Sequence, residues 1–187
     1  MNYIVLDLEA TCWEGHDKSR NETIEIGAVK VNSNKQIVSE FEQFIKPIRF
    51  PVLSDFCKQL TSITQQQVDE AKHYYEVIEE FKKWIGYPNK NYLLCSWGIY
   101  DRKQFESDNE LNNLESDWTI NHISLKHQYS KFKKLKRALG MKRALEHEGI
   151  KLEGFHHRGI DDARNISKIF IKNFDFWDFE NLTSKRE

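Results

Sequence analysis

The run YIVLDLEA at residues 3–10 puts two acids inside an otherwise apolar segment that contains β-branched residues. A short run of this kind is typical of a buried strand. Because successive side chains of a strand alternate between its faces, Asp7 and Glu9 point the same way, roughly 7 Å apart. One explanation is an alternating strand with one solvent-exposed face. The apolar neighbours instead indicate a strand covered on both faces, where two carboxylates would repel each other unless cations or hydrogen-bond donors compensated them.

The rest of the chain alternates between strand and helix patterns. Further strands are predicted at 23–31 and 37–47, which the turn NSNK separates, at 91–98 and, as an edge strand, at 118–123. Helices are predicted at 54–60, 74–86, 101–115, 124–139 and 160–174, and Gly140 is expected to end the fourth. A strand that follows helices predicts an α/β sheet.

Length and charge bound the domain organisation. We expect a single domain over 1–187, with a core at about 3–175 and a tail at 176–187, because 187 residues suffice for one core and are few for two. The aromatic-rich tail is either packed or a contact surface. Lys plus Arg number 28 and Asp plus Glu number 29, so the net charge gives no hint of a polyanionic partner.

The cysteines and the start of the chain bear on the compartment. The three cysteines are far apart and in no CxxC spacing, which argues against both a disulfide framework and a zinc cage. No apolar run approaches about 18 residues, and the first residues lack the basic segment of a secretion signal. We therefore expect a cytoplasmic protein with no membrane partner.

A third acid, Asp101, follows the predicted strand 91–98 at a predicted helix start. Aspartate is a favoured helix N-cap, which gives this residue a purely structural explanation. Its position just past the carboxyl end of a strand is also where open α/β sheets bind ligands. Asp101 is therefore a candidate site residue.

The segment EGFHHRGIDDARNISKIF at 153–170 carries two adjacent aspartates at the start of the last predicted helix. At 3.6 residues per turn, the core-facing arc of that helix consists of Ala163, Ile166, Ile169, Phe170 and Phe174. Asp162 lies along the edge of this arc, whereas Asp161 is rotated by about 100° away from it. Acids in a first turn also complement the helix dipole. We accept that explanation for Asp161 and predict that Asp162 faces inward.

Asp7, Glu9, Asp101 and Asp162 are thus predicted to meet at one end of the sheet. Hard oxygen ligands of this kind select Mg²⁺ or Mn²⁺ and not zinc. A carboxylate cluster suits two ions about 3.5 to 4 Å apart, which clamp the attacking and leaving oxygens of a phosphodiester. The predicted reaction class is metal-assisted phosphodiester hydrolysis.

A histidine near these acids would complete such a site, because its unperturbed pKa of about 6.5 allows it to take a proton from water near neutral pH. His156 and His157 both qualify by residue type. Both precede the predicted helix, so helical periodicity does not choose between them.

Several motifs in this order resemble the DEDD 3′-to-5′ exonucleases of the DEDDh branch, in particular the Eri-like ribonucleases and the bacterial KapD-type proteins. DLEATCWE is similar to the first exonuclease motif, CSWGIYDRKQF to the second and HHRGIDDARNI to the third. The segment KPIRFPVLSDFCKQLTSITQQQVDEA between them resembles the segment that characterises the Eri-like group. The resemblance extends from Asp7 to about Phe170.

This resemblance implies roles for the acids. Asp7, Glu9 and Asp162 would hold one ion, Asp7 would also touch a second, and Asp101 would act through the water shell of that second ion. The third motif of the family puts its histidine five residues before its aspartate. Counting back from the inward-facing Asp162 gives His157 as the general base.

The same resemblance implies that His156 and Asp161 are neighbours of the site and not catalysts. It implies the RNase H-like α/β fold, with a mixed five-stranded sheet flanked by helices in which three antiparallel strands come first. It also implies removal of nucleotides from a free 3′ end, preferentially of RNA or short structured RNA, with no small-molecule cofactor.

Candidate contacts to the nucleic acid fall into two sets. By similarity, the 3′-terminal nucleotides would meet Ala10, Thr11, Trp13, Leu60, Thr61, Trp97 and Tyr100. Between Trp118 and Leu145 there is no acid, while basic residues accumulate at Lys126, Lys131, Lys133, Lys134, Lys136, Arg137, Lys142 and Arg143. This stretch is suited to a phosphate backbone. Simple core packing of the aromatics and a solvated helix face are the structural alternatives.

Two other functions remain open from the sequence. A DNA exonuclease of the same branch would keep the mechanism and change the substrate, so single-stranded DNA is a second candidate partner. A regulatory protein could keep the fold to bind nucleic acid or protein without cleavage. The presence of all four acids and His157 argues against that last alternative.

Overall fold

A mixed sheet of six strands organises the residues that the structure, a computed structural model, describes: 1–15, 20–89 and 91–182. The strand order across the sheet is β4-β3-β2-β1-β5-β6. The strands are β1 (Asn2–Ala10), β2 (Thr23–Asn32), β3 (Ile37–Lys46), β4 (Lys72–His73), β5 (Tyr92–Ser96) and β6 (His122–Ser124). Strands β1, β2 and β3 are antiparallel neighbours, whereas β5 runs parallel to both β1 and β6. The mixed sheet and the early antiparallel strands expected from the sequence are confirmed.

The sixth strand is the difference from the expected five. Lys72 and His73 pair in parallel with Ile45 and Lys46 at the end of β3. A strand of two residues is too short to show a period of two in the sequence. The edge strand expected at 118–123 is present as β6, but it is shorter and is preceded by a 3₁₀ turn at Asp117–Thr119.

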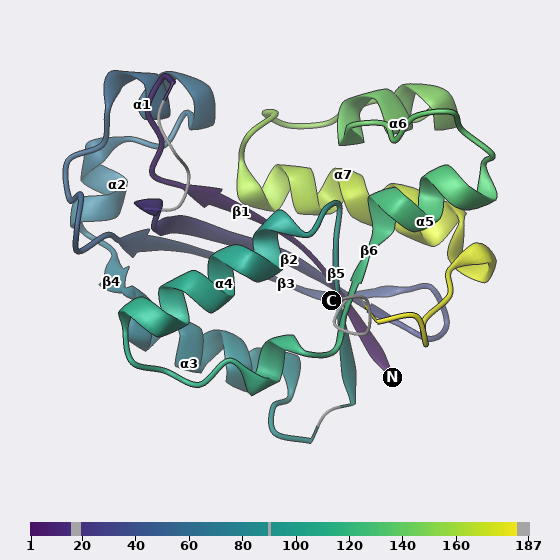
Figure 1. Ribbon diagram of the computed structural model, residues 1–187, viewed down its shortest axis with the longest axis horizontal. Helices are drawn as coiled ribbons and strands as arrows, with labels where there is room; N and C mark the ends of the chain where they lie inside the picture. Colours follow the sequence, from purple (N-terminus) through teal and green to yellow (C-terminus); the bar gives the residue numbers. More distant parts are fainter. Residues whose placement is uncertain (16–19, 90, 183–187) are drawn as a thin grey trace.

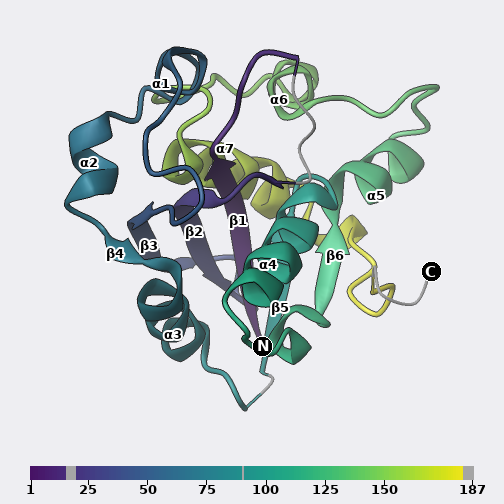
Figure 2. The ribbon, with the colours of Figure 1, turned by 60° about the vertical axis from the view of Figure 1, so that its left-hand side comes forward.

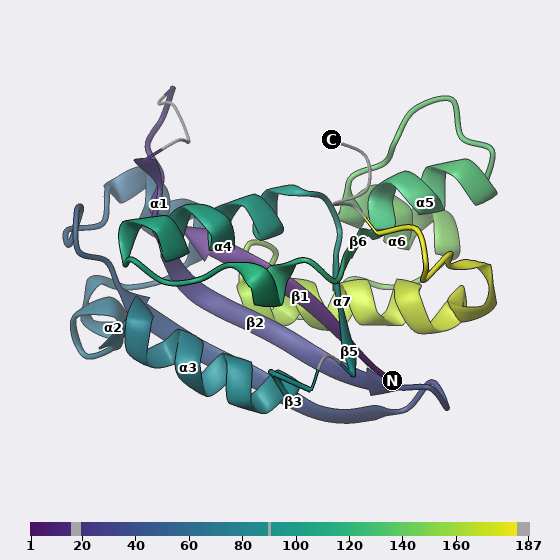
Figure 3. The ribbon, with the colours of Figure 1, turned by 60° about the horizontal axis from the view of Figure 1, so that its bottom comes forward.

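Helices cover both faces of the sheet (Figures 1 and 3). They are α1 (Asp55–Thr61), α2 (Gln65–Asp69), α3 (Tyr74–Ile85), α4 (Tyr100–Leu111), α5 (Leu125–Phe132), α6 (Met141–Glu148) and α7 (Gly159–Lys172). One core layer joins the sheet to α5, α6, α7 and Trp177, and the other joins it to α3, α4 and Trp118. The alternation of β1 serves both layers.

The odd-numbered residues of β1 face α7. Tyr3 and Val5 belong to the α7 layer, whereas Ile4 and Leu6 belong to the opposite layer. Continued alternation turns the next odd-numbered side chains towards α7 at the carboxyl end of the strand. In Figure 2, β1 runs towards the end of the molecule where α1 and α6 lie.

The basic segment forms two helices where the sequence predicted one at 124–139. Helix α5 ends at Phe132, and Lys134 has a left-handed backbone (φ 54°). Gly140 is the N-cap of the next helix and does not end the previous one. The like charges crowded between 131 and 137 disfavour a continuous helix, whereas the apolar face of α6 packs in the core.

Other differences are local. Helix α2 was not predicted; it is five residues long and begins with a capping box at Thr64. Helix α4 ends at Leu111, four residues before the predicted end.

In the tail, Trp177 is buried and Phe176 is 66% exposed, so the tail both packs and offers surface. Its last residues, 183–187, lie outside the described ranges. None of the helices within those ranges combines the length and the apolar character needed to cross a bilayer.

Candidate active site

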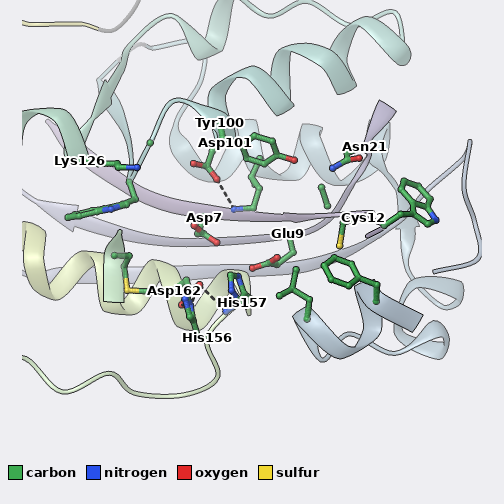
Figure 4. A pocket seen from close by; sticks show the side chains of 18 of the residues that line it. Asp7, Glu9, Cys12, Asn21, Tyr100, Asp101, Lys126, His156, His157 and Asp162 are labelled. Atoms are coloured by element: carbon green, nitrogen blue, oxygen red, sulfur yellow. Dashed lines mark hydrogen bonds and ion pairs between the residues drawn. The ribbon is translucent and has the colours of Figure 1, made fainter. Parts of the chain in front are cut away.

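Three carboxylates gather where β1 ends. Asp7 and Glu9 come from β1 and Asp162 from the first turn of α7, and one oxygen of each lies within 4.8 Å of the other two. Figure 4 shows the three side chains pointing into one pocket between the sheet and α7. The predicted meeting of these acids is therefore present in the structure.

Helical geometry explains why the third acid is Asp162. Its residue is 4% exposed and faces the sheet, together with the core arc of Ala163, Ile166 and Ile169. Asp161 faces the other way, where its carboxylate accepts hydrogen bonds from the Phe155 backbone N–H and the Arg164 guanidinium.

Two glycines let α7 approach the sheet closely. A Cβ atom on Gly27 would lie 2.0 Å from the backbone carbon of Gly159, so these backbones touch with no side chain between them. Gly27 is the neighbour of Asp7 across the β1–β2 pair. The close contact therefore brings the start of α7 directly over the acids of β1.

A buried acid that the sequence analysis missed fixes the start of α7. Glu25 of β2 is fully buried and accepts hydrogen bonds from the backbone N–H groups of Gly159 (3.0 Å) and Ile160 (3.4 Å). The Arg158 guanidinium also donates to Glu25 (3.2 Å) and bridges to Glu42 (3.1 Å). A carboxylate at a helix N-terminus complements both the free N–H groups and the dipole. The signal in the sequence is the single acid within TIEIGAVKV.

Asp101 lies across the pocket from Asp162 (Figure 4). It is in the first turn of α4 and is 5% exposed, and Ile99, not Asp101, is the N-cap. Its Oδ1 accepts the backbone N–H of Leu8 at 3.1 Å, which ties α4 to the end of β1. The N-cap alternative is therefore wrong, and the carboxylate belongs to the pocket.

Burial and mutual repulsion dominate the electrostatics of the cluster. Loss of hydration, followed by repulsion from Asp101 and Glu9, raises the pKa of Asp7 well above its usual range. Burial and then the Asp162 carboxylate raise the pKa of Glu9 to about 9. Burial raises the pKa of Asp101 to about 6, and it also raises the pKa of Asp162. Crowded oxygen donors of this kind fit hard divalent cations, whose charge would reverse these shifts.

Both histidines of the third motif lie at the pocket. The Nδ1 atom of His156 is 3.0 Å from Oδ2 of Asp162, and the backbone N–H of His157 donates to that same oxygen at 3.0 Å. The two imidazole rings stack with centroids 4.0 Å apart. Burial, followed by the neighbouring His156, lowers the pKa of His157.

The acids and histidines line a cavity of about 550 Å³. Five of the seven predicted nucleotide contacts also line it: Ala10, Trp13, Leu60, Trp97 and Tyr100. Leu60 and Tyr100 are each 37% exposed, so they offer surface to a ligand. The Trp97 indole is 7% exposed and donates to the Leu139 carbonyl, which gives it a packing role as well.

Thr11 and Thr61 do not line the cavity. Thr11 is 1% exposed, and its hydroxyl accepts the Glu22 backbone N–H. Thr61 is fully buried, and its hydroxyl donates to the Cys57 carbonyl. Both hydroxyls therefore bond to the backbone.

Several lining residues were missed by the sequence analysis, among them Cys12, Asn21, Phe56, Lys126 and Met141. Phe56 could have been found, because it precedes Leu60 by four residues and so shares its face of α1. Of the predicted basic residues, all of which lie in described parts of the chain, only Lys126 is among those that line the cavity.

The strand order and the carboxylate cluster together define an RNase H-like α/β protein with a site suited to divalent cations. A model of the RNase_T exonuclease family matches residues 4–170, and the chain belongs to this family. The DEDDh resemblance is confirmed by a crystal structure of the nuclease domain of 3′hExo, a DEDDh family member, bound to rAMP. The two chains are 30% identical and superimpose with a TM-score of 0.87, over 93% of this chain and 92% of that one.

Curated relatives support the same family assignment. ERI1 exoribonuclease 2 of Xenopus laevis is 33% identical, over 89% of this chain and 27% of the relative. The probable 3′-5′ exonuclease KapD of Bacillus subtilis (strain 168) is 29% identical, over 89% of this chain and 82% of the relative. The chain thus spans just over a quarter of the length of that exoribonuclease and most of the length of the bacterial protein.

Proposed function

We propose that this chain is a divalent-metal-dependent 3′-to-5′ exonuclease that hydrolyses phosphodiester bonds from the 3′ end of RNA. The observation that carries the proposal is the cluster of Asp7, Glu9 and Asp162, whose oxygens lie within 4.8 Å of one another in an RNase_T family domain. The names of the relatives support the direction of cleavage, and the exoribonucleases among them support RNA.

The residues present fit two Mg²⁺ or Mn²⁺ ions. Asp7, Glu9 and Asp162 would hold the first, Asp7 would share the second, and Asp101 would reach that second ion through water. When bound, such a pair stabilises the charge that develops on the attacking and leaving oxygens of a phosphodiester.

The protein's own acid–base chemistry is assigned to His157. Its lowered pKa keeps the imidazole neutral near pH 7, so a ring nitrogen can accept a proton from the attacking water. The oxygen of that water bonds to phosphorus while the bond from phosphorus to the 3′ oxygen of the preceding nucleotide breaks, and this 3′ oxygen takes up a proton from solvent to become a hydroxyl. The terminal nucleotide then leaves as a 5′-monophosphate.

The walls of the cavity suit a terminal nucleoside. Leu60 and Phe56 of α1 line the cavity together with Tyr100, which precedes Asp101 in α4. Apolar and aromatic surfaces of this kind hold an unpaired base by stacking, which adds about 1 to 3 kcal/mol per base. Lys126 supplies a positive charge for a phosphate at the rim.

The test uses RNA and DNA oligonucleotides of one sequence, labelled at the 3′ end. We expect release of the label first as a mononucleotide, full inhibition by EDTA, and a faster time course on RNA. Release of internal fragments first would exclude an exonuclease. A faster course on DNA would reassign the substrate to the DNA branch of the family.

The assignment of the base has its own test in a matched pair of variants. His157→Ala should slow cleavage by about 10²-fold or more, because it removes the proton acceptor. His156→Ala should slow cleavage far less. Equal rates for His157→Ala and the wild type would remove His157 from the mechanism.

A further inference from the structure

The two histidines of HHRGIDD form a second group of ligand atoms beside the acids. One ligand atom from each of His156, His157 and Asp162 lies within 4.8 Å of the other two. Adjacent side chains of an extended chain point to opposite sides. His157 has a left-handed backbone (φ 66°), and its ring stacks on that of His156, so both rings lie on the same side as Asp162.

We propose that His156, His157 and Asp162 form a binding site for a transition-metal ion of the zinc class, which shares Asp162 with the acid cluster. Two imidazoles and one carboxylate with a fourth position left for water is a known type of zinc coordination. Mg²⁺ and Mn²⁺ prefer oxygen donors and would leave this set to softer ions.

For His156 and Asp162 the geometry is close to what such an ion requires, and a ligand atom of His157 lies within 4.8 Å of both. Ligands about 2.0 to 2.1 Å from a tetrahedral zinc are roughly 3.3 Å from one another. The Nδ1 atom of His156 is already 3.0 and 3.2 Å from the two carboxylate oxygens of Asp162. An ion would take the place of the proton that this hydrogen bond shares. The His156 side chain is 37% exposed, so the site opens to solvent.

Asp162 belongs to both groups of ligand atoms. An ion held by the histidines would draw this carboxylate away from Asp7 and Glu9, and it would occupy a lone pair of His157. The expected consequence, which rests on the proposed function, is inhibition. A zinc-class ion at this site inhibits the nuclease even while Mg²⁺ or Mn²⁺ is present in excess.

The direct test needs no nuclease activity. Metal-free protein is titrated with Co²⁺ alone, whose visible absorption is strong in a four-coordinate site containing nitrogen and weak among six oxygens. We expect strong absorption that Zn²⁺ displaces, since Zn²⁺ binds such ligands more tightly than Co²⁺. Absence of the strong absorption in the wild type would overturn the site.

The decisive variant is His156→Gln. A glutamine amide can still donate a hydrogen bond to Asp162, but it is a poor zinc ligand, so the orientation of Asp162 is kept while the site loses a donor. We expect the affinity for Co²⁺ to fall at least about tenfold in His156→Gln. The matched control is His127→Gln, another exposed histidine whose Nδ1 has a single side-chain partner, Ser124. It should bind as the wild type does.

The functional test compares each variant with itself, as the ratio of cleavage rates with and without Zn²⁺ at constant Mn²⁺. His156→Gln should need at least about tenfold more Zn²⁺ for half inhibition than the wild type and His127→Gln. Unchanged Zn²⁺ sensitivity in His156→Gln would refute the proposal, because zinc would then act at the acid cluster. If the wild type binds Co²⁺ but cleaves no oligonucleotide, this result would count against the proposed function alone.

Discussion

Glu9 and Glu148 are both 8% exposed, yet their carboxyl groups have opposite electrostatic surroundings. Burial and the Asp162 carboxylate raise the pKa of Glu9 to about 9. Burial acts in the same direction on Glu148, but hydrogen bonds from Lys133, Tyr129 and Lys172 outweigh it and lower the pKa to about 2. Glu148 is thus an acid that the fold itself neutralises.

Glu25 resembles Glu148 in this respect, because Arg158 and backbone N–H groups at the start of α7 surround it. Within one domain, then, buried acids that hold the structure together have their donors built in. Asp7 and Glu9, which end β1, face other acids instead, and a bound cation would compensate their charge. The lack of such donors supports the proposal that Asp7 and Glu9 are functional carboxylates.

The largest effect should come from neutralising an acid of the cluster. Asp162→Asn should lower the cleavage rate by at least about 10³-fold, the upper range for removing one electrostatic contact to a transition state. Asp161→Asn is the matched control one residue away, since Asp161 already has Arg164 as its partner. Single-turnover cleavage of an end-labelled oligonucleotide measures both, and equal losses would mean that membership of the acid cluster does not distinguish Asp162 from Asp161.

Neutralising the partnered Glu25 should act on stability. Glu25→Gln leaves Arg158 with Glu42 alone and weakens the bonds to the start of α7, for a loss of roughly 3 kcal/mol in the free energy of unfolding. Glu42→Gln removes the other, 42% exposed partner of Arg158 and should cost less than about 1 kcal/mol. Urea unfolding compares them, and a similar midpoint for the two variants would show that the buried bond adds nothing beyond the exposed one.

Glu148→Gln should destabilise the protein by about 1 to 2 kcal/mol near pH 7, through loss of charged hydrogen bonds. Because the pKa of Glu148 is lower in the folded chain than its ordinary 4.5, the folded state binds fewer protons than the unfolded state between those values. The stabilisation is therefore complete above about pH 4.5 and disappears as the pH falls towards about 2. Melting temperatures of wild type and variant should converge on acidification, whereas the exposed Glu146→Gln should track the wild type at every pH.

The smallest effect has the opposite sign. Glu9→Gln should raise the stability of the metal-free protein near pH 7, by on the order of 1 kcal/mol. With a pKa of about 9, Glu9 must take up a proton when the chain folds, and glutamine avoids this cost. A change of this size shifts the melting temperature by about 2 to 4 °C in a domain of this length. The gain measured in EDTA should vanish when Mn²⁺ is added. A lower melting temperature for Glu9→Gln in EDTA would contradict the distinction drawn here.

Periodicity in the sequence was enough to predict much of this site. The alternation of YIVLDLEA put Asp7 and Glu9 on one face, and helical periodicity chose Asp162 over Asp161, as the structure confirms. The roles assigned to these residues remain predictions.

What the sequence did not reveal depends on contacts between distant segments. Glu25 sits in a strand whose alternation looks ordinary until α7 covers it. The break after α5 was not predicted because Lys and Arg are individually good helix formers. The repulsion between their clustered charges disfavours a continuous helix. Similarity to the family predicts that Thr11 and Thr61 contact the substrate, but their hydroxyls form hydrogen bonds with backbone groups.

The contact between Gly27 and Gly159 has a consequence for engineering this domain. Because these backbones touch directly, the spacing between the acids of β1 and Asp162 is a main-chain dimension that no repacking of side chains can adjust. A chimera that imported α7 from a relative would preserve the carboxylate geometry only if a glycine faced Gly27. The start of α7 and the middle of β2 would therefore have to be exchanged together.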